Sequence, residues 1–392
     1  MAMIETGITK LDDYLMGGIP NGKSLVYYIH PGVEGNVFGM QTLYHNLAKG
    51  SKCVFIASSS DPLMIKDMFK EFGWNLDAHD ENLIVVDAYS GLVGAPSNEK
   101  YVVEDPESID SLNESIEKVM EELDENATVM FESLSTIMDL CGEKETIDAV
   151  KNWNMHGMLY EHVLIYNFTA WPYEPETLDL IKHELFDAVI TVGGIAERVI
   201  FGQYFGVLKA EWSDIELKSM LFRVLRPGGI RIYIPKIVVT GPYNAGKSTF
   251  VHALSTRAVS VDRIGTTVAL DHGHVDHKGF SADIFGTPGQ ERFDPIIKML
   301  SGEAMGIFLV VDSTNTKDFV RAKQMLEITK AYGLPLVVIA NKQDQSGALK
   351  PEEIRSHFTI PESVQILPAI ADKGVGVFEA FEALVDKITE VA

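Results

Sequence analysis

The residues best suited to chemistry lie in one short run, Gly241-Pro242-Tyr243-Asn244-Ala245-Gly246-Lys247-Ser248-Thr249. Glycines at both ends let backbone N–H groups turn inward around the α- and β-phosphates of a nucleotide. A lysine directly after the second glycine reaches the β- and γ-phosphates, and the next hydroxyl binds Mg²⁺. We therefore predict a phosphate-binding loop made by Gly241, Asn244, Ala245, Gly246, Lys247, Ser248 and Thr249, with Ser248 also a metal ligand.

A second motif, Asn341-Lys342-Gln343-Asp344, follows the apolar run Leu336–Ala340. A carboxylate can accept hydrogen bonds from both the ring N1–H and the exocyclic amino group of guanine, whereas adenine has no such donor pair. Asp344 is therefore predicted to select guanine. Asn341 would connect this loop to the phosphate-binding loop, and the stem of Lys342 would lie over the base. The two motifs together predict GTP or GDP, with Mg²⁺, as the ligand.

These motifs resemble those of the Ras-superfamily small GTPases over residues 236–392. In that family a glutamine after a phosphate-sensing glycine orients the attacking water. The segment Gly286-Thr287-Pro288-Gly289-Gln290 matches this pattern, so the resemblance implies nucleotide binding by Gly289 and catalysis by Gln290, together with Lys247.

Gly286 departs from the family, which has at this place a carboxylate that helps to hold Mg²⁺. Asp283 stands three residues earlier and could be aligned with the family's carboxylate. That alignment would put Gly289 and Gln290 out of register with the family's glycine and glutamine, so we take Gly286 as the equivalent position. A similar Pro-Gly-Gln form occurs in the polarity-type GTPases of bacteria and archaea. The segment is also similar to the GTPases of the SRP-receptor-β type.

The resemblance further implies a switch threonine whose hydroxyl completes the Mg²⁺ sphere when the γ-phosphate is present. Thr266 and Thr267 are the candidates, and the spacing from the phosphate-binding loop favours Thr267 for the metal and catalytic role. Ala371 is assigned to the family's last base-contacting motif. No arginine in the first switch is an obvious arginine finger, but Arg257 and Arg263 are near enough in the sequence to remain candidates. Slow hydrolysis, accelerated by a GTPase-activating partner, is the expectation.

Three histidines next to this segment, His272, His274 and His277, raise the alternative of a zinc site. On a strand, His272 and His274 share a face, but His277 follows the turn-like pair Val275-Asp276, and no cysteine joins them. We interpret the segment as an exposed hairpin beside the first switch.

The elements that must position these residues form two series in which apolar, strand-like runs alternate with helical stretches. Such alternation is typical of a mostly parallel sheet covered on both faces. We therefore predict an α/β fold made of two three-layer domains of the P-loop NTPase type. The first series of runs is Leu25–Ile29, Cys53–Ala57, Leu83–Val86, Thr128–Phe131 and Val163–Tyr166, and the second is Ile237–Thr240, Ser281–Phe285, Ile307–Val311, Leu336–Ala340 and Val364–Leu367.

The predicted domains are residues 1–233 and 234–392, with the boundary near Pro235. Hairpin strands over Val199–Ala210 and Gly229–Ile234 are expected to close the first domain. Within that domain, the acidic run Glu99–Glu125 has apolar residues at helical spacing and predicts an amphipathic helix with a solvated acidic face.

The start of the first domain resembles the RecA/KaiC-like ATPases, through Gly7-Ile8-Thr9-Lys10-Leu11-Asp12 and the run Gly17–Ser24. In that family a phosphate-binding loop comes next. Here Asn36 replaces its lysine, Val37 its Mg²⁺-binding hydroxyl, and His30 its first glycine. Without the ammonium and the hydroxyl, ATP should bind poorly or not at all.

The other catalytic residues of that family are missing as well. Its paired glutamates align with Ser59 and Ser60, and Glu132 is the one carboxylate that survives at the end of a strand. The resemblance therefore implies a degenerate, non-hydrolysing domain that serves as a platform for partner docking or self-association.

The composition excludes several classes of protein. The formal net charge is −23, and most of it lies in residues 1–233, which argues against nucleic acid as a partner. No apolar run is long enough to cross a bilayer, and two cysteines make no disulfide framework. A cytoplasmic protein is expected.

The sequence thus favours a cytoplasmic GTP-binding switch that hydrolyses GTP slowly with Mg²⁺ and acts on a protein effector. One alternative is a module that senses GTP or GDP without useful turnover, because Gly286 lacks the metal-holding carboxylate. The other, a RecA-like ATPase acting on DNA, is disfavoured by Asn36, Val37 and the acidic charge.

Overall fold

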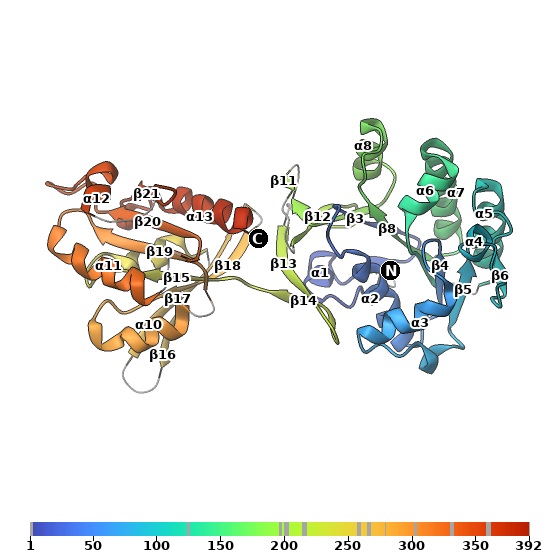
Figure 1. Ribbon diagram of the computed structural model, residues 1–392, viewed down its shortest axis with the longest axis horizontal. Coiled ribbons are helices and arrows are strands. Elements are labelled where there is room, and N and C mark those ends of the chain that lie inside the picture. Colours follow the sequence, from blue (N-terminus) through green and yellow to red (C-terminus); the bar gives the residue numbers. More distant parts are fainter. Residues whose placement is uncertain are drawn as a thin grey trace. The chain divides into compact units, whose positions relative to one another are not determined.

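The structure, a computed structural model, divides the chain into two compact units, Met1–Tyr233 and Ile234–Ala392 (Figure 1). Each unit mixes helices with a mostly parallel sheet, so the predicted α/β class is confirmed. The residues described are 3–123, 126–195, 198–199, 204–213, 218–256, 260–264, 268–278, 280–301, 304–329, 333–357 and 362–391.

The main sheet of the first unit has the strand order β6-β5-β4-β7-β8-β3-β9-β12-β13-β14. The strands from β6 to β9 in this order are parallel, and the last three are antiparallel. Parallel strands are covered on both faces, which explains why their sequences are nearly continuous apolar runs. The bounds are β3 (Ser24–Ile29), β4 (Cys53–Ala57), β5 (Leu83–Asp87), β6 (Tyr101–Val102), β7 (Thr128–Phe131), β8 (Val163–Thr169), β9 (Ala188–Val192), β12 (Tyr204–Ala210), β13 (Lys218–Leu225) and β14 (Gly229–Tyr233).

Strands close this unit where they were expected, at β12 and β14, and β13 lies between them and pairs with both. Val199, the first residue of the expected run, lies instead in β11 (Arg198–Val199), which pairs with β10 (Gly194–Ile195) in a separate small sheet. A further small sheet joins β1 (Met3–Ile4) and β2 (Ile19–Pro20).

The predicted acidic helix is confirmed as α5 (Ile109–Glu122). Leu112, Ile116 and Met120 are buried in the core, whereas Glu114 and Glu121 are exposed. The helices of the first unit are α1 (Thr9–Tyr14), α2 (Asn36–Ala48), α3 (Pro62–Glu71), α4 (Ser90–Val93), α5, α6 (Leu134–Cys141), α7 (Glu143–Leu159) and α8 (Pro175–His183), with a 3-10 turn η1 (Leu76–His79).

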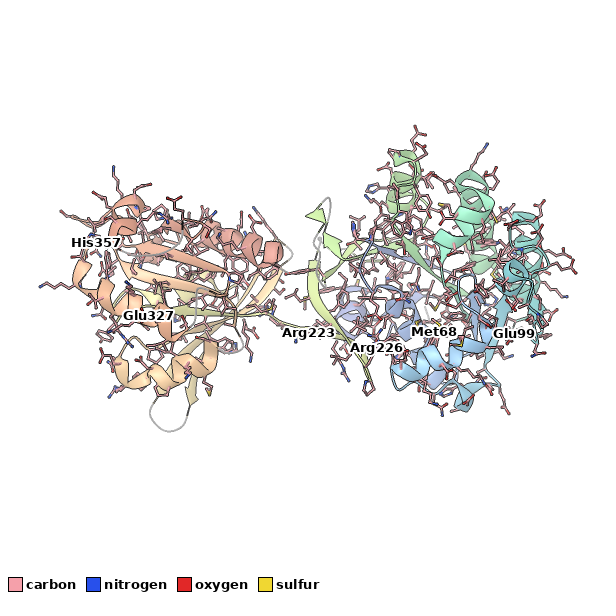
Figure 2. The ribbon with its side chains drawn as sticks, in the orientation of Figure 1. Met68, Glu99, Arg223, Arg226, Glu327 and His357 are labelled. Atoms are coloured by element: carbon pink, nitrogen blue, oxygen red, sulfur yellow. The ribbon has the colours of Figure 1, made fainter. Side chains whose placement is uncertain are left out.

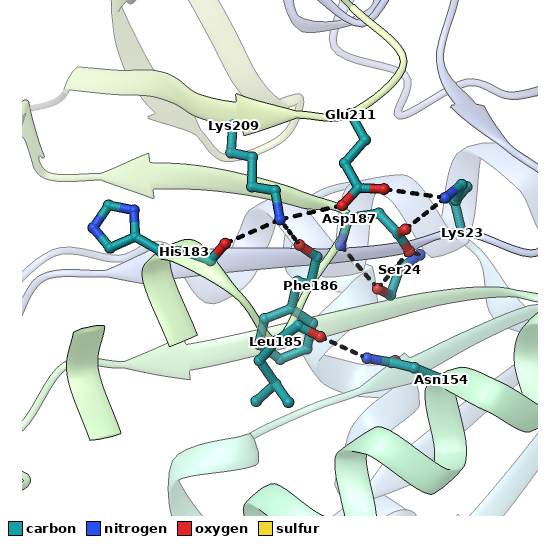
Figure 3. Close-up of polar contacts among 9 residues, drawn as sticks. All are labelled: Lys23, Ser24, Asn154, His183, Leu185, Phe186, Asp187, Lys209 and Glu211. Atoms are coloured by element: carbon teal, nitrogen blue, oxygen red, sulfur yellow. Dashed lines mark hydrogen bonds and ion pairs between the residues drawn. The ribbon is translucent and has the colours of Figure 1, made fainter. Parts of the chain in front are cut away.

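A polar cluster ties the start of β3 to the start of β9 (Figure 3). The Asp187 carboxylate accepts hydrogen bonds from Lys23 Nζ at 2.6 Å, from the Ser24 backbone N–H at 2.8 Å and from the Ser24 hydroxyl at 2.9 Å. Burial raises the pKa of Asp187, but these bonds outweigh it, so the net pKa lies below its usual value. Glu211, just after β12, also pairs with Lys23. The cluster therefore holds three strand ends together.

An Asp187→Asn substitution is expected to destabilise the first unit by about 2 kcal/mol at pH 7. Because the native pKa is lowered, this stabilisation is complete above the unfolded-state pKa of about 4 and is lost as the pH falls through the native value. The protein's tryptophans, Trp74, Trp153, Trp171 and Trp212, all lie in the first unit, so urea denaturation followed by tryptophan fluorescence reports on that unit alone.

The matched control is Asp148→Asn, which removes an exposed acid that pairs with Lys151. It should change the free energy of unfolding by less than about 1 kcal/mol. Equal stability of Asp187→Asn and the wild type at pH 7 would contradict the role given to the cluster.

The sheet of the second unit has the strand order β16-β17-β18-β15-β19-β20-β21. The strands from β18 to β21 in this order are parallel, and β16 and β17 are antiparallel. The bounds are β15 (Lys236–Thr240), β16 (Ser260–Ile264), β17 (Val268–His277), β18 (Phe280–Gly286), β19 (Ala304–Asp312), β20 (Leu336–Asn341) and β21 (Gln365–Pro368).

In this unit, α9 packs against α13 and α10 packs against α11. The helix bounds are α9 (Lys247–Leu254), α10 (Asp294–Ser301), α11 (Phe319–Ile328), α12 (Pro351–His357) and α13 (Val377–Val391), with 3-10 turns η2 (Glu291–Phe293), η3 (Thr316–Asp318) and η5 (Ala371–Lys373).

Among the described residues of the whole chain, no helix has the length and hydrophobicity that crossing a bilayer requires.

The parallel strands bring the sequence motifs to one edge of this sheet. β15 leads into the phosphate-binding loop, β18 into Thr287–Gln290, and β20 into Lys342–Asp344. Because carboxyl ends of parallel strands meet at the same edge, the three segments gather there.

Candidate nucleotide site

The phosphate-binding loop joins β15 to α9, and its shape depends on its two glycines. Gly241 has a φ of 146°, and a Cβ there would lie 2.1 Å from the carbonyl oxygen of Val310. Gly246 has a φ of 96°, and a Cβ there would lie 2.2 Å from Nδ2 of Asn341. Any side chain at either position would collide with its neighbours, so the loop requires glycine at both.

Lys247 is buried at the start of α9. Its Nζ donates a hydrogen bond of 2.7 Å to the carbonyl oxygen of Pro242. Burial lowers the pKa of Lys247 to about 8, and repulsion from Arg321 adds to this shift, whereas attraction to Asp271 opposes it. An ammonium that has lost its water is stabilised by a nearby anion. A phosphate group beside Nζ would supply that anion.

A cavity of about 660 Å³ opens over this loop, which is in the size range of small-molecule sites. The segments that line it are the loop itself, the stretch after β18, one residue of β17 and Lys342. Of the predicted site residues, the cavity brings together Asn244, Gly246, Lys247, Ser248, Thr249, Gly289, Gln290 and Lys342. Gly241, Ala245, Asn341, Asp344 and Ala371 are not part of its lining.

The segment after β18 lies directly on the phosphate-binding loop. A Cβ at Gly289 would lie 2.5 Å from the backbone nitrogen of Tyr243, so this position also has room only for glycine. Arg321 of α11 donates a hydrogen bond to the Gly289 carbonyl oxygen at 3.4 Å and pairs with Asp294. Gln290 is exposed in the cavity wall. The glutamine therefore borders the space beside Lys247.

Asn341 connects two loops through its side chain. Its Nδ2 donates to the carbonyl oxygen of Ala245 at 3.0 Å, and its Oδ1 accepts from the backbone N–H of Ala371 at 3.0 Å. These bonds link the Asn341–Asp344 motif to the phosphate-binding loop and to the segment after β21.

The two charged residues of this motif have partners in the structure. Lys342 donates to Asp312 at the end of β19 at 2.5 Å. Asp344 pairs with Lys373 at 2.7 Å, which lowers the pKa of Asp344. Its carboxylate is therefore ionised at neutral pH.

Several predicted residues cannot be placed in this site. Thr266, Thr267 and Arg257 lie outside the described residues, so their roles stay predictions. Arg263 lies in β16. Gly286 lines the cavity, whereas Asp283 pairs with His274 at 2.9 Å and is not part of the lining.

The three histidines all lie on β17, so the turn expected at Val275-Asp276 is wrong: the strand continues through His277. His274 pairs with Asp283, and His277 pairs with Glu382 of α13 at 2.8 Å. Across the described part of the chain, no three His, Cys, Asp or Glu side chains are grouped closely enough to hold a metal ion.

The sequence reasoning missed Asp271, the residue of β17 that lines the cavity. The available signal was an acid in the strand that follows the first switch, at a position that pairs with the end of β18. That signal becomes visible only once the register of the two strands is known.

In the first unit, the loop between β3 and α2 has contacts of its own. Val33 lies against Gly193, where a Cβ would be 2.4 Å from Val33 Cγ2. Glu34 pairs with Arg226, whose position is labelled in Figure 2. Glu132 Oε2 accepts hydrogen bonds from the backbone N–H groups of Ser59 at 2.9 Å and Ser60 at 3.1 Å. The surviving carboxylate is thus bound to the residues that stand in place of the catalytic glutamates.

Comparison with known proteins identifies both units. Residues 4–237 match the KaiC family of ATPases. The chain belongs to the KaiC family. Residues 232–388 match the ADP-ribosylation factor (Arf) family, so this KaiC-family chain carries an Arf-family domain after its first unit. The predicted combination of a KaiC-like domain and a Ras-superfamily domain is confirmed.

Relatives of each part are known separately. A UPF0273 protein of Saccharolobus solfataricus is 31% identical over 141 residues, which are 35% of this chain and 50% of that protein. The ADP-ribosylation factor-like protein 3 of Chlamydomonas reinhardtii is 29% identical over 161 residues, 39% of this chain and 90% of that protein. The chain spans about half the length of the UPF0273 proteins it matches. A solved KaiC-like protein of Pyrococcus horikoshii has 19% identity and a TM-score of 0.47, and covers 59% of this chain and 99% of its own.

Proposed function

We propose that the Arf-family domain is a GTP-binding switch that hydrolyses GTP slowly with Mg²⁺ and signals to a protein effector in the cytoplasm. The observation that carries the proposal is the cavity at the carboxyl edge of the second sheet, where Lys247, Ser248, Gln290 and Lys342 meet. Arf-family membership supports nucleotide hydrolysis of the GTPase type.

The residues of the cavity fit a magnesium nucleotide. The lining supplies a buried ammonium from Lys247, a hydroxyl from Ser248 and a carboxylate from Asp271, and oxygen donors are the ligands that Mg²⁺ takes. Ser248 and the predicted Thr267 would hold the ion. When bound, Mg²⁺ neutralises phosphate charge.

The chain's own residues would perform the remaining steps. Lys247 binds the β- and γ-phosphates, and Gln290 orients the water that attacks the γ-phosphorus. Asp344 accepts the two donors of guanine, and Asn341 holds the base-reading loop against the phosphate-binding loop through Ala245. Rearrangement of Thr267 and of the Gly289-Gln290 loop between nucleotide states would create the switch.

The first unit would serve as a docking platform for this switch rather than as a second nucleotide-hydrolysing domain. The positions of lysine and hydroxyl are taken by Asn36 and Val37, and Glu132 is engaged by Ser59 and Ser60. We therefore propose that residues 1–233 no longer hydrolyse ATP and instead dock partners or associate with another copy.

Calorimetric titration of the whole chain with GTP, GDP and ATP tests these assignments together. We expect one site per chain that prefers guanine nucleotides. Tighter binding of ATP than of GTP would overturn the proposal, and a second site that binds ATP would overturn the platform role of the first unit.

A second candidate is a module that senses GTP or GDP without useful turnover, and the observation that favours it is Gly286 at the end of β18. The two candidates are distinguished by the rate of phosphate release in single-turnover reactions, compared between the wild type and a Gln290→Leu variant.

Gln290→Leu is expected to slow hydrolysis on the order of 10²-fold while leaving GTP affinity unchanged, because it removes water positioning but no phosphate contact. Gln324→Leu, a substitution of an exposed glutamine on α11, is the matched control and should hydrolyse GTP at the wild-type rate. Background-level rates for the wild type and Gln290→Leu alike would reject the enzyme and favour the binding module.

A further inference from the structure

Strand β18 ends at Gly286, so the carboxylate that similar GTPases carry at this place is missing from the strand itself. The cavity nevertheless contains an acid. Asp271 of β17 lines it together with Lys247, Ser248 and Gly286. The source of this acid is a neighbouring strand.

The register of the two strands places Asp271 opposite Gly286. β17 and β18 are antiparallel, and Asp271 and Gly286 are direct Cα partners. Directly opposed residues of an antiparallel pair put their side chains on the same face of the sheet. Asp271 therefore presents its carboxylate on the face where a side chain of residue 286 would stand.

The distances show how closely the two positions coincide. A Cβ at Gly286 would lie 3.2 Å from the Cβ of Asp271 and 3.3 Å from its Oδ2. An aspartate at 286 would therefore compete with Asp271 for the same space, and two carboxylates there would repel each other. Glycine at 286 leaves this space to Asp271.

Asp271 also lies close to the residue that is predicted to bind the metal. It lines the same cavity as Lys247 and Ser248. The acid thus stands near the hydroxyl that is predicted to bind the metal.

We propose that Asp271 supplies the carboxylate of the Mg²⁺ site from strand β17, in place of the carboxylate absent at Gly286; this inference rests on the function proposed above. The acid of the metal site has moved one strand across the sheet, and the glycine opposite it is the complementary change. Such carboxylates around a metal typically contribute 10- to 100-fold to its affinity.

The test measures how Mg²⁺ slows the release of a fluorescent GDP analogue, N-methylanthraniloyl-GDP, from the full chain. Release rates are recorded across a Mg²⁺ titration and with EDTA. Asp271→Asn keeps the shape of the side chain and removes its charge. The double variant Asp271→Ser with Gly286→Asp returns the acid to β18. Asp276→Asn, an acid farther along β17, is the control.

In Asp271→Asn we expect the half-effective Mg²⁺ concentration to rise at least about tenfold, with an unchanged release rate in EDTA. The double variant should return to within about threefold of the wild type, and Asp276→Asn should match the wild type. Wild-type Mg²⁺ dependence in Asp271→Asn would overturn the inference. Faster release of the analogue in EDTA would also overturn it, because the aspartate would then act on the loop rather than on the metal. A double variant whose half-effective Mg²⁺ concentration stays as high as that of Asp271→Asn would overturn it as well.

These outcomes are distinct from failure of the proposed function. If the wild type does not bind the GDP analogue at all, the GTP-binding proposal fails before any variant is compared. If it binds the analogue equally well with Mg²⁺ and with EDTA, the inference about Asp271 fails and guanine binding stands.

Discussion

A Lys247→Met variant is expected to bind GTP and GDP about 10³-fold more weakly than the wild type. At a separation of about 4 Å and an effective dielectric constant of about 20, one ion pair is worth roughly 4 kcal/mol. The wild-type protein also has the ammonium already in place, because Lys247 is buried and held by Pro242. Methionine fills the same space without the charge, so calorimetry on the two proteins measures the electrostatic contribution.

The control for this variant is Lys323→Met, which removes an exposed lysine of α11 and should leave nucleotide affinity unchanged. Because the ligand-free pKa of Lys247 is lowered from about 10.5 to about 8, the folded state loses stability as the pH falls through this range, and the full cost of burying the charge is present below pH 8. Lys247→Met should therefore be at least as stable as the wild type without nucleotide. A Lys247→Met protein that is folded and still binds GTP within tenfold of the wild type would contradict the role of Lys247.

The parts of the site that follow a strand were predictable from the sequence. The loop after Thr240 and the motif starting at Asn341 both follow apolar runs that are strands in the structure, β15 and β20. Parallel strands bring such segments to one edge, so their meeting required no knowledge of side-chain packing. The expected link from Asn341 to the phosphate-binding loop is present, and its acceptor is the carbonyl oxygen of Ala245.

The parts that depend on strand register were not predictable. Asp271 faces the cavity because it pairs with Gly286, and a shift of one residue would turn it to the other face of the sheet. Nothing in the local sequence of β17 specifies that register. Asp312, the partner of Lys342, could not be predicted for the same reason, because it belongs to the neighbouring strand β19.

The two units share a local architecture but differ in the residues that begin the corresponding helix. In each, a buried strand leads into a loop and then a helix, β3 to α2 in the first and β15 to α9 in the second. The second places the buried Lys247 at the start of its helix, whereas the first begins its helix with Asn36. Because the sheet is stabilised by apolar burial rather than by the loop, the fold itself does not require a lysine at this position.

An Asp344→Asn variant is expected to lose about 10³-fold in GTP affinity and to gain affinity for XTP. Two hydrogen bonds to a charged carboxylate are worth roughly 3 to 6 kcal/mol together, and an amide can accept only one of the two guanine donors. The amide NH₂ group instead matches the 2-carbonyl oxygen of xanthine. The exchange of base preference, measured by competition between GTP and XTP, is specific to a residue that reads the base edge.

A structural role for Asp344 would give a different result. Its pair with Lys373 is also lost in the variant, so Asp372→Asn, which removes an exposed neighbouring acid, is the control and should keep the wild-type preference. Weaker binding of GTP and XTP alike would show that Asp344 acts through the loop and not on guanine. A gain for XTP cannot come from loss of the Lys373 pair, because that pair is equally absent with either nucleotide, and it would therefore assign base selection to this side chain.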